Sequence, residues 1–364
     1  MKKILSVVLA LTLMMALCAC GGNTPDTGDD NRNTTTTTTT TATEATTTTE
    51  AVVEDTTTAP IDTTTEAQTT TVATETAAPT TSTTKGVTAT KAPTTTKKVS
   101  TTTVTYAPVP ESISILAVGN SFSVDAMRHH LYPMLQSAGY KNIRLGILYI
   151  GGASIDTHYD NLRLDRGKYQ YQENVNGTWT YTEDYKASTA FALTDWDIVT
   201  VQQVSNDSGR GPSYENLPAL MELLKPQIGD AKIYWHMTWA YQQDSTHSGF
   251  ANYNKDQMRM YRGIVSATKN KIVNNTDFVG IIPSGTSIQN LRTSGLGDTL
   301  TADGYHLSDT YGDYTAALTW FCMFSGRPAT SMSYRPATIS DYFNEIAESV
   351  DNALKTPFAV TKCE

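Results

Sequence analysis

The stretch Ile113-Ser-Ile-Leu-Ala-Val-Gly119-Asn120-Ser121-Phe-Ser123 opens the part of the chain that has the sequence of a folded domain. Its apolar run predicts a short parallel strand that is buried on both faces. Gly119 predicts a sharp turn, because glycine takes backbone conformations that other residues avoid. Ser121 is then expected where the strand ends and a helix begins, the edge at which open α/β sheets bind ligands. Taken alone, the stretch fits an ordinary turn with a helix-capping serine at least as well.

Strands and helices alternate after this stretch. The pattern predicts strands at 113–119, 143–150, 197–201, 232–237 and 278–282, with helices at 125–138, 217–228, 254–274 and 309–324 between or after them. Such alternation predicts a parallel sheet with right-handed crossovers. We therefore expect an α/β fold over residues 110–358, a three-layer α/β/α sandwich around a five-stranded parallel sheet. Residues 160–186 form a long excursion or a β-hairpin with an Asn176-Gly177 turn.

Each predicted strand ends in polar or glycine-rich residues. The ends carry Ser121, then Gly151-Gly152, then Gln202 to Asn206, then His236 to Tyr241, then Ser284. In a parallel sheet these ends share one edge, so the side chains are expected to converge there. Ordinary loop chemistry explains any one of them, but not readily all five.

The Asp303-Gly-Tyr-His306 segment precedes the last predicted long helix of the domain. Three-residue spacing lets one loop present Asp303 and His306 to the same cleft. A histidine can accept the proton of a serine hydroxyl, and a carboxylate can orient that histidine. The alternatives are a packed or capping histidine and an aspartate that belongs to the turn before Gly304.

The order of these segments resembles the SGNH hydrolases, also called the GDSL esterase/lipase superfamily. The resemblance covers residues 112–325 and rests on Gly119-Asn120-Ser121, Gly151-Gly152, Gln202 to Asn206 and Asp303-x-x-His306. It implies a flavodoxin-like sandwich and a serine esterase in which Ser121, His306 and Asp303 form the catalytic triad. No cofactor is implied. The sequence is similar to a bacterial branch of the superfamily with a Gly-Asn-Ser nucleophile segment.

The chain departs from the family pattern at two points. Asn120 stands where the family has an aspartate that mainly shapes the turn, so the nucleophile is retained. The third segment lacks a clean Gly-x-Asn-Asp. Both Gln203 and Asn206 are therefore candidates for the amide of the oxyanion hole, alongside the backbone N–H groups of Gly151 and Gly152.

The expected substrate is an ester on carbohydrate, most simply an O-acetyl group. The predicted cleft edge is rich in aromatic residues that stack on sugar rings, of which Trp239, Tyr241 and Tyr305 are the substrate-binding candidates. These rings would equally suit the hydrophobic core. A second hypothesis is a non-catalytic glycan- or surface-binding module that keeps the same fold.

Residues 1–22 have the layout of a secretory signal, with Lys2 and Lys3 before the apolar run Ile4 to Leu17. The following Leu17-Cys-Ala-Cys20-Gly resembles a bacterial lipobox, which implies lipidation of Cys20; simple secretion is the alternative. Residues 23–108 are dominated by threonine and predict a disordered linker. Together they predict a protein on the bacterial cell surface that contacts the membrane through a lipid anchor alone.

The composition argues against several other functions. The 364 residues carry a formal net charge of −9 and no basic cluster in the folded part, so no nucleic-acid partner is expected. A metal-dependent hydrolase using His236, His247 or Asp303 lacks the usual ligand spacing. Cys322 and Cys363 lie outside the signal, and their pairing stays open.

Overall fold

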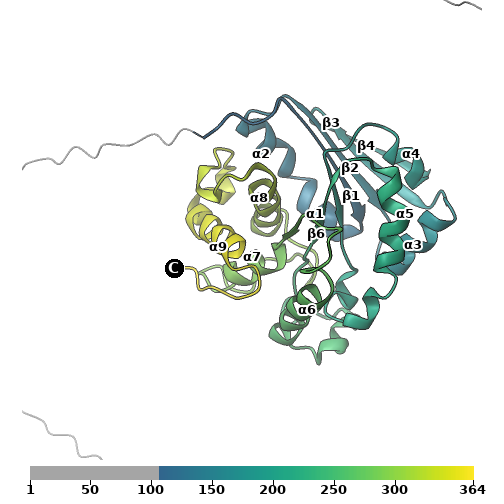
Figure 1. Ribbon diagram of the computed structural model, residues 1–364. Helices are drawn as coiled ribbons and strands as arrows, with labels where there is room; N and C mark the ends of the chain where they lie inside the picture. The colour runs from purple at the N-terminus through teal and green to yellow at the C-terminus, as the bar shows by residue number, and fades with distance from the viewer. Residues whose placement is uncertain (1–105) are drawn as a thin grey trace, which may run out of the picture. The chain divides into compact units, whose positions relative to one another are not determined.

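The computed structural model describes residues 106–364, which form an α/β domain (Figure 1). The predicted signal peptide, Cys20 and all of the linker before residue 106 lie outside the described residues. Within residues 106–364, no helix combines the length and apolar character needed to cross a lipid bilayer.

The centre of the sheet is β1 (Ser112–Gly119), whose neighbours are β2 (Asn142–Tyr149) and β5 (Ile198–Val201). It is buried on both faces from Ile113 to Gly119, as its unbroken apolar run predicts. The sheet continues through β6 (Lys232–His236) to β7 (Gly280–Ile282), and these five strands are parallel. Their order, β2-β1-β5-β6-β7, is the flavodoxin-like order. Its switch point lies between β1 and β5, so Ser121 and the segment after Val201 flank one crevice.

The sheet has seven strands and is mixed, so the prediction of five parallel strands was incomplete. The 160–186 excursion contains a hairpin of β3 (Tyr169–Val175) and β4 (Thr178–Tyr185), and β3 pairs antiparallel with β2. Asn176 and Gly177 both have positive φ, 52° and 99°, as a two-residue hairpin turn of this kind requires. The pairing of β3 with β4 shifts register between Tyr169 and Tyr171.

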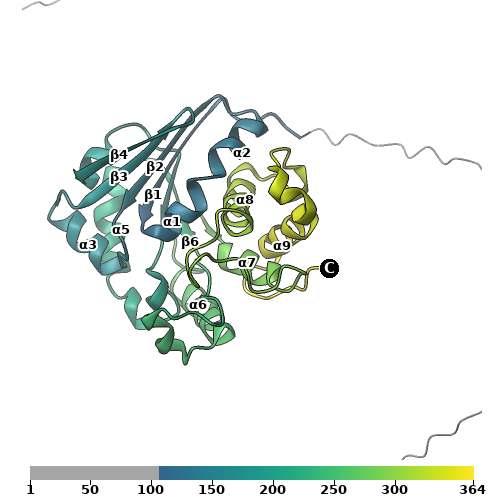
Figure 2. The same ribbon diagram turned by 180° about the vertical axis from the view of Figure 1, so that it is seen from behind.

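Helices cover both faces of the sheet (Figures 1 and 2). One face carries α3 (Ile155–Arg163), α4 (Ala187–Phe191) and α5 (Leu217–Leu224), and the other carries α1 (Ser121–Met127), α2 (Leu131–Ala138), α8 (Tyr311–Ser325) and α9 (Phe343–Lys355). Two further helices complete the domain, α6 (Gln257–Lys271) and α7 (Ser284–Leu291), the latter packed on α8 and α9. This is the expected three-layer arrangement.

The single helix predicted over 125–138 is two helices, α1 and α2. The interruption at residues 128–130 coincides with tertiary hydrogen bonds. His129 Nδ1 lies 2.6 Å from Asp313 Oδ2, and His130 Nε2 lies 2.9 Å from the Asp309 carbonyl oxygen. Both partners belong to the start of α8 or the segment before it. Cys322 and Cys363 are buried free thiols, so no disulfide joins them.

We expect His158 to make the fold sensitive to acid. It is buried on α3 beside the Tyr169 hydroxyl, and burial lowers its pKa to about 4. Between pH 6.5 and pH 4, His158 binds a proton in the unfolded chain but stays neutral in the folded chain. The free energy of unfolding should therefore decrease as the pH is lowered from 6.5 to 4, by at most about 1.4 kcal/mol per pH unit. Urea unfolding of His158→Phe between pH 7 and 4.5 should show a shallower loss than the wild type; an unchanged slope would contradict this role.

Candidate active site

The turn between β1 and α1 presents Ser121 at the crevice. Asn120 caps α1: its Oδ1 accepts a hydrogen bond from the Phe122 N–H at 3.0 Å, and its Nδ2 donates to the Ala153 carbonyl at 3.0 Å. Asn120 therefore shapes the turn, and Ser121 becomes the first residue of the helix. Gly119 has no positive φ. Glycine is needed there for space, because a Cβ would lie 2.2 Å from Ser123 Oγ.

Ser121, His306 and Asp303 form a hydrogen-bonded line. Ser121 Oγ lies 2.8 Å from His306 Nε2, and His306 Nδ1 lies 2.8 Å from Asp303 Oδ2. The serine and histidine are 185 residues apart, so only the fold brings them together. These distances match a nucleophile, its general base and the group that orients the base.

The second oxygen of Asp303 fixes the shape of the same loop. Asp303 Oδ1 accepts hydrogen bonds from the N–H groups of Tyr305 at 3.1 Å and His306 at 2.8 Å. Burial alone would raise the pKa of Asp303, but the hydrogen bonds from His306 and Tyr305 outweigh it and hold the pKa below its ordinary value. Asp303 is thus a carboxylate at neutral pH. Because a carboxylate only accepts hydrogen bonds, its contact with His306 favours the tautomer that has the proton on Nδ1 and an acceptor at Nε2, facing Ser121.

A cleft of about 310 Å³ opens beside Ser121 and His306. We call it the oxyanion cleft; its other lining residues are Asn120, Tyr149, Gly151, Gly152, Val204, Ser205, Asn206, His247 and Tyr305. Ser121 is at the N-terminus of α1, where a backbone N–H has no acceptor within its own helix. The loop of Gly151 and Gly152 follows β2 and is exposed. Gly151 and Gly152 therefore lie beside Ser121 at the edge of the sheet, where the sequence pattern predicted them.

Asn206 and Gln203, the two amide candidates, have different surroundings. Gln203 is buried, its Oε1 accepts from the N–H groups of Ile155 and Val204, and its Nε2 donates to Ser213. It does not line the oxyanion cleft. Asn206 lines the cleft, and the hydrogen bonds that it receives from Asn252 and Tyr253 go to its backbone carbonyl and leave its side-chain amide uncommitted. Of the two candidates, Asn206 is therefore the better placed, because the amide of Gln203 is used to hold the loops after β2 and β5.

A family model described as "Domain of unknown function (DUF4886)" matches residues 114–353, which include all of these site residues. The chain belongs to the DUF4886 family. It is similar over its folded part to the crystal structure of a DUF4886 protein from Bacteroides uniformis, with 39% identity and a TM-score of 0.66, covering 69% of this chain and 98% of that chain. No protein among the curated sequences matches it.

More distant solved structures share similarity with this DUF4886 domain. One is a putative SGNH hydrolase from Slackia heliotrinireducens, with 18% identity and a TM-score of 0.38, covering 58% of this chain and 97% of that chain. Another is a catalytic mutant of an acetylxylan esterase from Geobacillus stearothermophilus, with 13% identity and a TM-score of 0.34, covering 58% of this chain and 92% of that chain.

Two of the three aromatic candidates of this DUF4886 protein lie in the core. Trp239 and Tyr241 are fully buried, so neither ring can stack on a ligand, whereas Tyr305 lines the oxyanion cleft. Trp239 instead supports the site: its ring stacks on Phe122 at 4.2 Å, and its Nε1 donates to the Tyr305 carbonyl at 2.8 Å. Tyr241 bonds to Ser205 Oγ. The position of Trp239 and Tyr241 after a strand predicted that they lie near the site, but it did not predict that their rings are buried.

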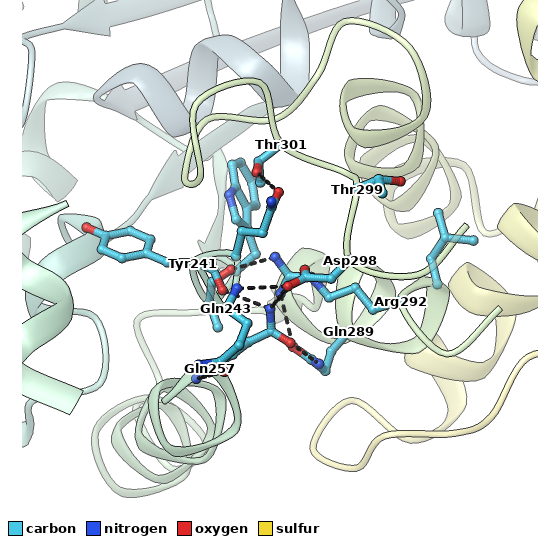
Figure 3. Close-up of polar contacts among 12 residues, drawn as sticks. Tyr241, Gln243, Gln257, Gln289, Arg292, Asp298, Thr299 and Thr301 are labelled. Atoms are coloured by element: carbon cyan, nitrogen blue, oxygen red, sulfur yellow. Dashed lines mark hydrogen bonds and ion pairs between the residues drawn. The ribbon is translucent and has the colours of Figure 1, made fainter. Parts of the chain in front are cut away.

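An ion pair between the buried Arg292 and the partly exposed Asp298 holds the loop that leads to Asp303 (Figure 3). Arg292 is almost fully buried, and its Nε lies 2.8 Å from Asp298 Oδ1, an ion pair rather than an aligned hydrogen bond. Its Nη2 donates to the Ala240 carbonyl at 3.0 Å. Asp298 also accepts hydrogen bonds from Gln257 Nε2 and the Gln243 N–H. The loop is thereby tied to α6 and to the segment after β6.

Sequence reasoning missed other residues at the DUF4886 site. His247 was considered as a metal ligand, but it lines the oxyanion cleft and packs on the Tyr305 ring at 4.7 Å. Its Nδ1 accepts a hydrogen bond from the Gly249 N–H, and burial together with His306 lowers its pKa. His236 is buried between Gln202 and Ser284. The sequence analysis also did not single out Asp125, one turn after Ser121 on α1, or Arg128, at the end of this helix. Their helical spacing from Ser121 could have indicated both.

Proposed function

We propose that this protein is a serine esterase that removes O-acetyl groups from carbohydrate. The observation that carries the proposal is the Ser121–His306–Asp303 line, with 2.8 Å between each pair of interacting atoms. It lies at the switch point of the sheet, beside an open cleft. An esterase needs a nucleophile, a base and a binding site for the carbonyl oxygen at one place, and Ser121, His306 and the adjoining cleft are the candidates for these three roles.

The reaction proceeds in two halves. Ser121 Oγ attacks the ester carbonyl carbon while its proton passes to His306 Nε2, and Asp303 stabilises the imidazolium. The bond to the alcohol oxygen then breaks, and that oxygen takes the proton from His306. Water attacks the acetyl-serine with His306 again as base, which releases acetate and restores Ser121.

The carbonyl oxygen carries the negative charge of each tetrahedral intermediate. We assign its stabilisation to the backbone N–H of Ser121, the N–H of Gly151 or Gly152, and the side-chain amide of Asn206. Asn206 is favoured because its amide is uncommitted and lines the same cleft as the other donors. Preorganised donors of this kind lower the barrier because they need no reorientation as charge develops.

Replacing Asn206 with alanine should lower kcat for acetyl-ester hydrolysis by about 10²- to 10³-fold, the usual effect of losing one oxyanion donor. KM should change little, because the hydrogen bond strengthens only as charge develops. Steady-state kinetics on 4-nitrophenyl acetate measure both constants. The control is Asn216→Ala, an exposed asparagine that bonds to Asp156 instead of lining the cleft. Equal kcat for Asn206→Ala and the control would contradict the assignment.

A small acyl group suits the oxyanion cleft. Its volume is about 310 Å³, and polar groups line much of it, among them Ser205, Asn206 and His247. A long acyl chain would need an extended apolar groove at the same place. Tyr149 and Tyr305 are the tyrosines that line the cleft, and they are the aromatic candidates for contact with the bound ester.

The test is labelling by a fluorophosphonate probe, which reacts with an activated serine. The wild type should be labelled at Ser121, identified by peptide mass spectrometry, and His306→Gln should be labelled much more slowly. Acetate release from acetylated xylan, mucin glycans and peptidoglycan then identifies the polymer. A protein that binds these glycans but is neither labelled nor releases acetate is the non-catalytic module, and the esterase proposal is wrong.

We also propose that the enzyme works at the bacterial cell surface, tethered through a lipid on Cys20. The support is the lipobox-like Leu17-Cys-Ala-Cys20-Gly and the threonine-rich residues that follow it. Metabolic labelling with a clickable fatty acid should modify the wild type and leave Cys20→Ala unmodified.

A further inference from the structure

A second cleft also borders the catalytic pair. It measures about 390 Å³ and is formed by α1 and by β2 and β3; we call it the α1–β3 cleft. It shares Ser121, Tyr149 and His306 with the oxyanion cleft. The residues that it does not share are Val124, Asp125, Arg128, Gln170 and Gln172. An ester bound at Ser121 can therefore extend into both clefts, one for each side of the scissile bond.

Arg128 is held in this cleft by the β3–β4 hairpin. The Trp179 side chain donates to the Arg128 carbonyl at 3.0 Å, and the guanidinium lies 5.7 Å from the centre of the Tyr181 ring. Arg128 Nη2 donates to Gln172 Oε1 at 2.8 Å. Gln172 Nε2 donates in turn to Gln170 Oε1. The side-chain oxygens of Gln172 and Gln170 thus both accept hydrogen bonds within this series. The series holds the guanidinium of Arg128 in one orientation before a ligand binds.

Arg128 forms no ion pair with a described carboxylate, and its charge acts on Asp313 only from beyond ion-pair distance. Among the ion pairs of residues 106–364, none includes Arg128. Its Nε is buried and has no hydrogen-bond acceptor. Asp125 is the one acidic residue that lines the cleft, and its Oδ2 accepts a hydrogen bond from the Leu307 N–H at 2.9 Å. Burial, then the charge of Asp313, raises the pKa of Asp125 to about 8, which favours the neutral carboxyl at pH 7.

We infer that the α1–β3 cleft binds the alcohol half of the ester and that Arg128 recognises a carboxylate on that alcohol. This inference rests on the proposed esterase function. The proposed oxyanion donors Gly151, Gly152 and Asn206 line the other cleft and not this one. We therefore place the carbonyl oxygen on that side and the leaving alcohol on this one, next to His306. A fixed guanidinium with free N–H donors is the group that proteins use for planar carboxylates. The substrate class is thus an acetylated acidic sugar, such as an O-acetylated uronic acid.

The experiment compares matched substrates on the full-length protein. 3-Acetoxybenzoate and 3-acetoxybenzamide release similar phenols, but only the first carries a carboxylate on the alcohol side. The wild type should favour the benzoate in kcat/KM by about tenfold or more, mainly through KM, as expected for a hydrogen bond to a charged group. Arg128→Gln should lose this preference while its rate on the benzamide stays within about threefold of the wild type.

Arg163→Gln is the matched control, because Arg163 also lies over a tyrosine ring, at 5.8 Å from that of Tyr159, but lines neither cleft. It should keep the full preference. A wild type without preference, or an Arg128→Gln variant that retains it, overturns the inference. So does a preference seen only with 4-nitrophenyl hemisuccinate over 4-nitrophenyl acetate, since that carboxylate is on the acyl side. Absence of Ser121-dependent turnover on every substrate would instead reject the esterase proposal itself.

Discussion

Replacing Ser121 with alanine is expected to lower kcat for acetyl-ester hydrolysis by about 10⁴-fold or more. The hydroxyl is the proposed attacking group, and no neighbouring side chain occupies its position 2.8 Å from His306 Nε2. The fold should be unaffected, because alanine is a good first residue for α1 and the cap is made by Asn120. Thermal unfolding of the variant and the wild type should therefore give the same Tm.

Ser123→Ala separates this effect from a general loss of a serine near the turn. Ser123 Oγ is buried and donates to Gln202 Oε1 at 2.7 Å. Removing it should cost about 1 kcal/mol of stability while most of the activity remains. If Ser121→Ala kept wild-type turnover, or if both variants lost activity equally, the assignment of the nucleophile would fail.

Replacing Asp298 with asparagine is expected to lower the free energy of unfolding by about 3 kcal/mol, because it leaves the buried Arg292 without its counter-charge. The same change replaces one of the two accepting oxygens by an NH2 group, so the hydrogen bonds from the Gln243 N–H and Gln257 cannot all be kept (Figure 3). Since this loop leads into Asp303 and His306, kcat should fall as well. Urea unfolding and kinetics on one preparation measure both effects.

Asp277→Asn is the control for this prediction. Asp277 pairs with Lys225 at 2.6 Å, but the lysine is half exposed, so losing this pair should cost less than about 1 kcal/mol. Adding Arg292→Met to Asp298→Asn should recover part of the lost stability, because the uncompensated cation is removed. If both aspartate variants lost the same free energy of unfolding, the Arg292–Asp298 pair would contribute no more to stability than the partly exposed Lys225–Asp277 pair.

The parallel strands could be predicted because they are short apolar runs followed by polar or glycine residues. That pattern placed Ser121, Gly151 and Asn206 at one edge of the sheet without any knowledge of distance. Asp303 and His306 could be paired because three-residue spacing keeps both on one loop. Those parts of the site depend on local sequence and on the general property that parallel strands share an edge.

The remaining features depend on contacts between distant residues. Nothing in the sequence around Gln203 shows that its amide is used by Ile155 and Ser213. The burial of Trp239 follows from stacking on Phe122, which is more than a hundred residues away. Arg128 likewise gained a role only when the hairpin was found to pack over the end of α1. Hydrophobic patterning identifies a strand end, but not which of its side chains point into the cleft.

The register shift in the hairpin also affects how the molecule avoids self-association. β4 is one edge of the sheet, and an exposed edge strand can template pairing with another chain. Between Thr182 and Tyr185, β4 carries one more residue than β3, and Asp184 there has a positive φ of 51°. This bulge places Glu183 and Asp184 on the open edge, where bent backbone and negative charge both oppose strand addition. The opposite edge, β7, is only three residues long, so neither edge offers a long, flat surface for aggregation.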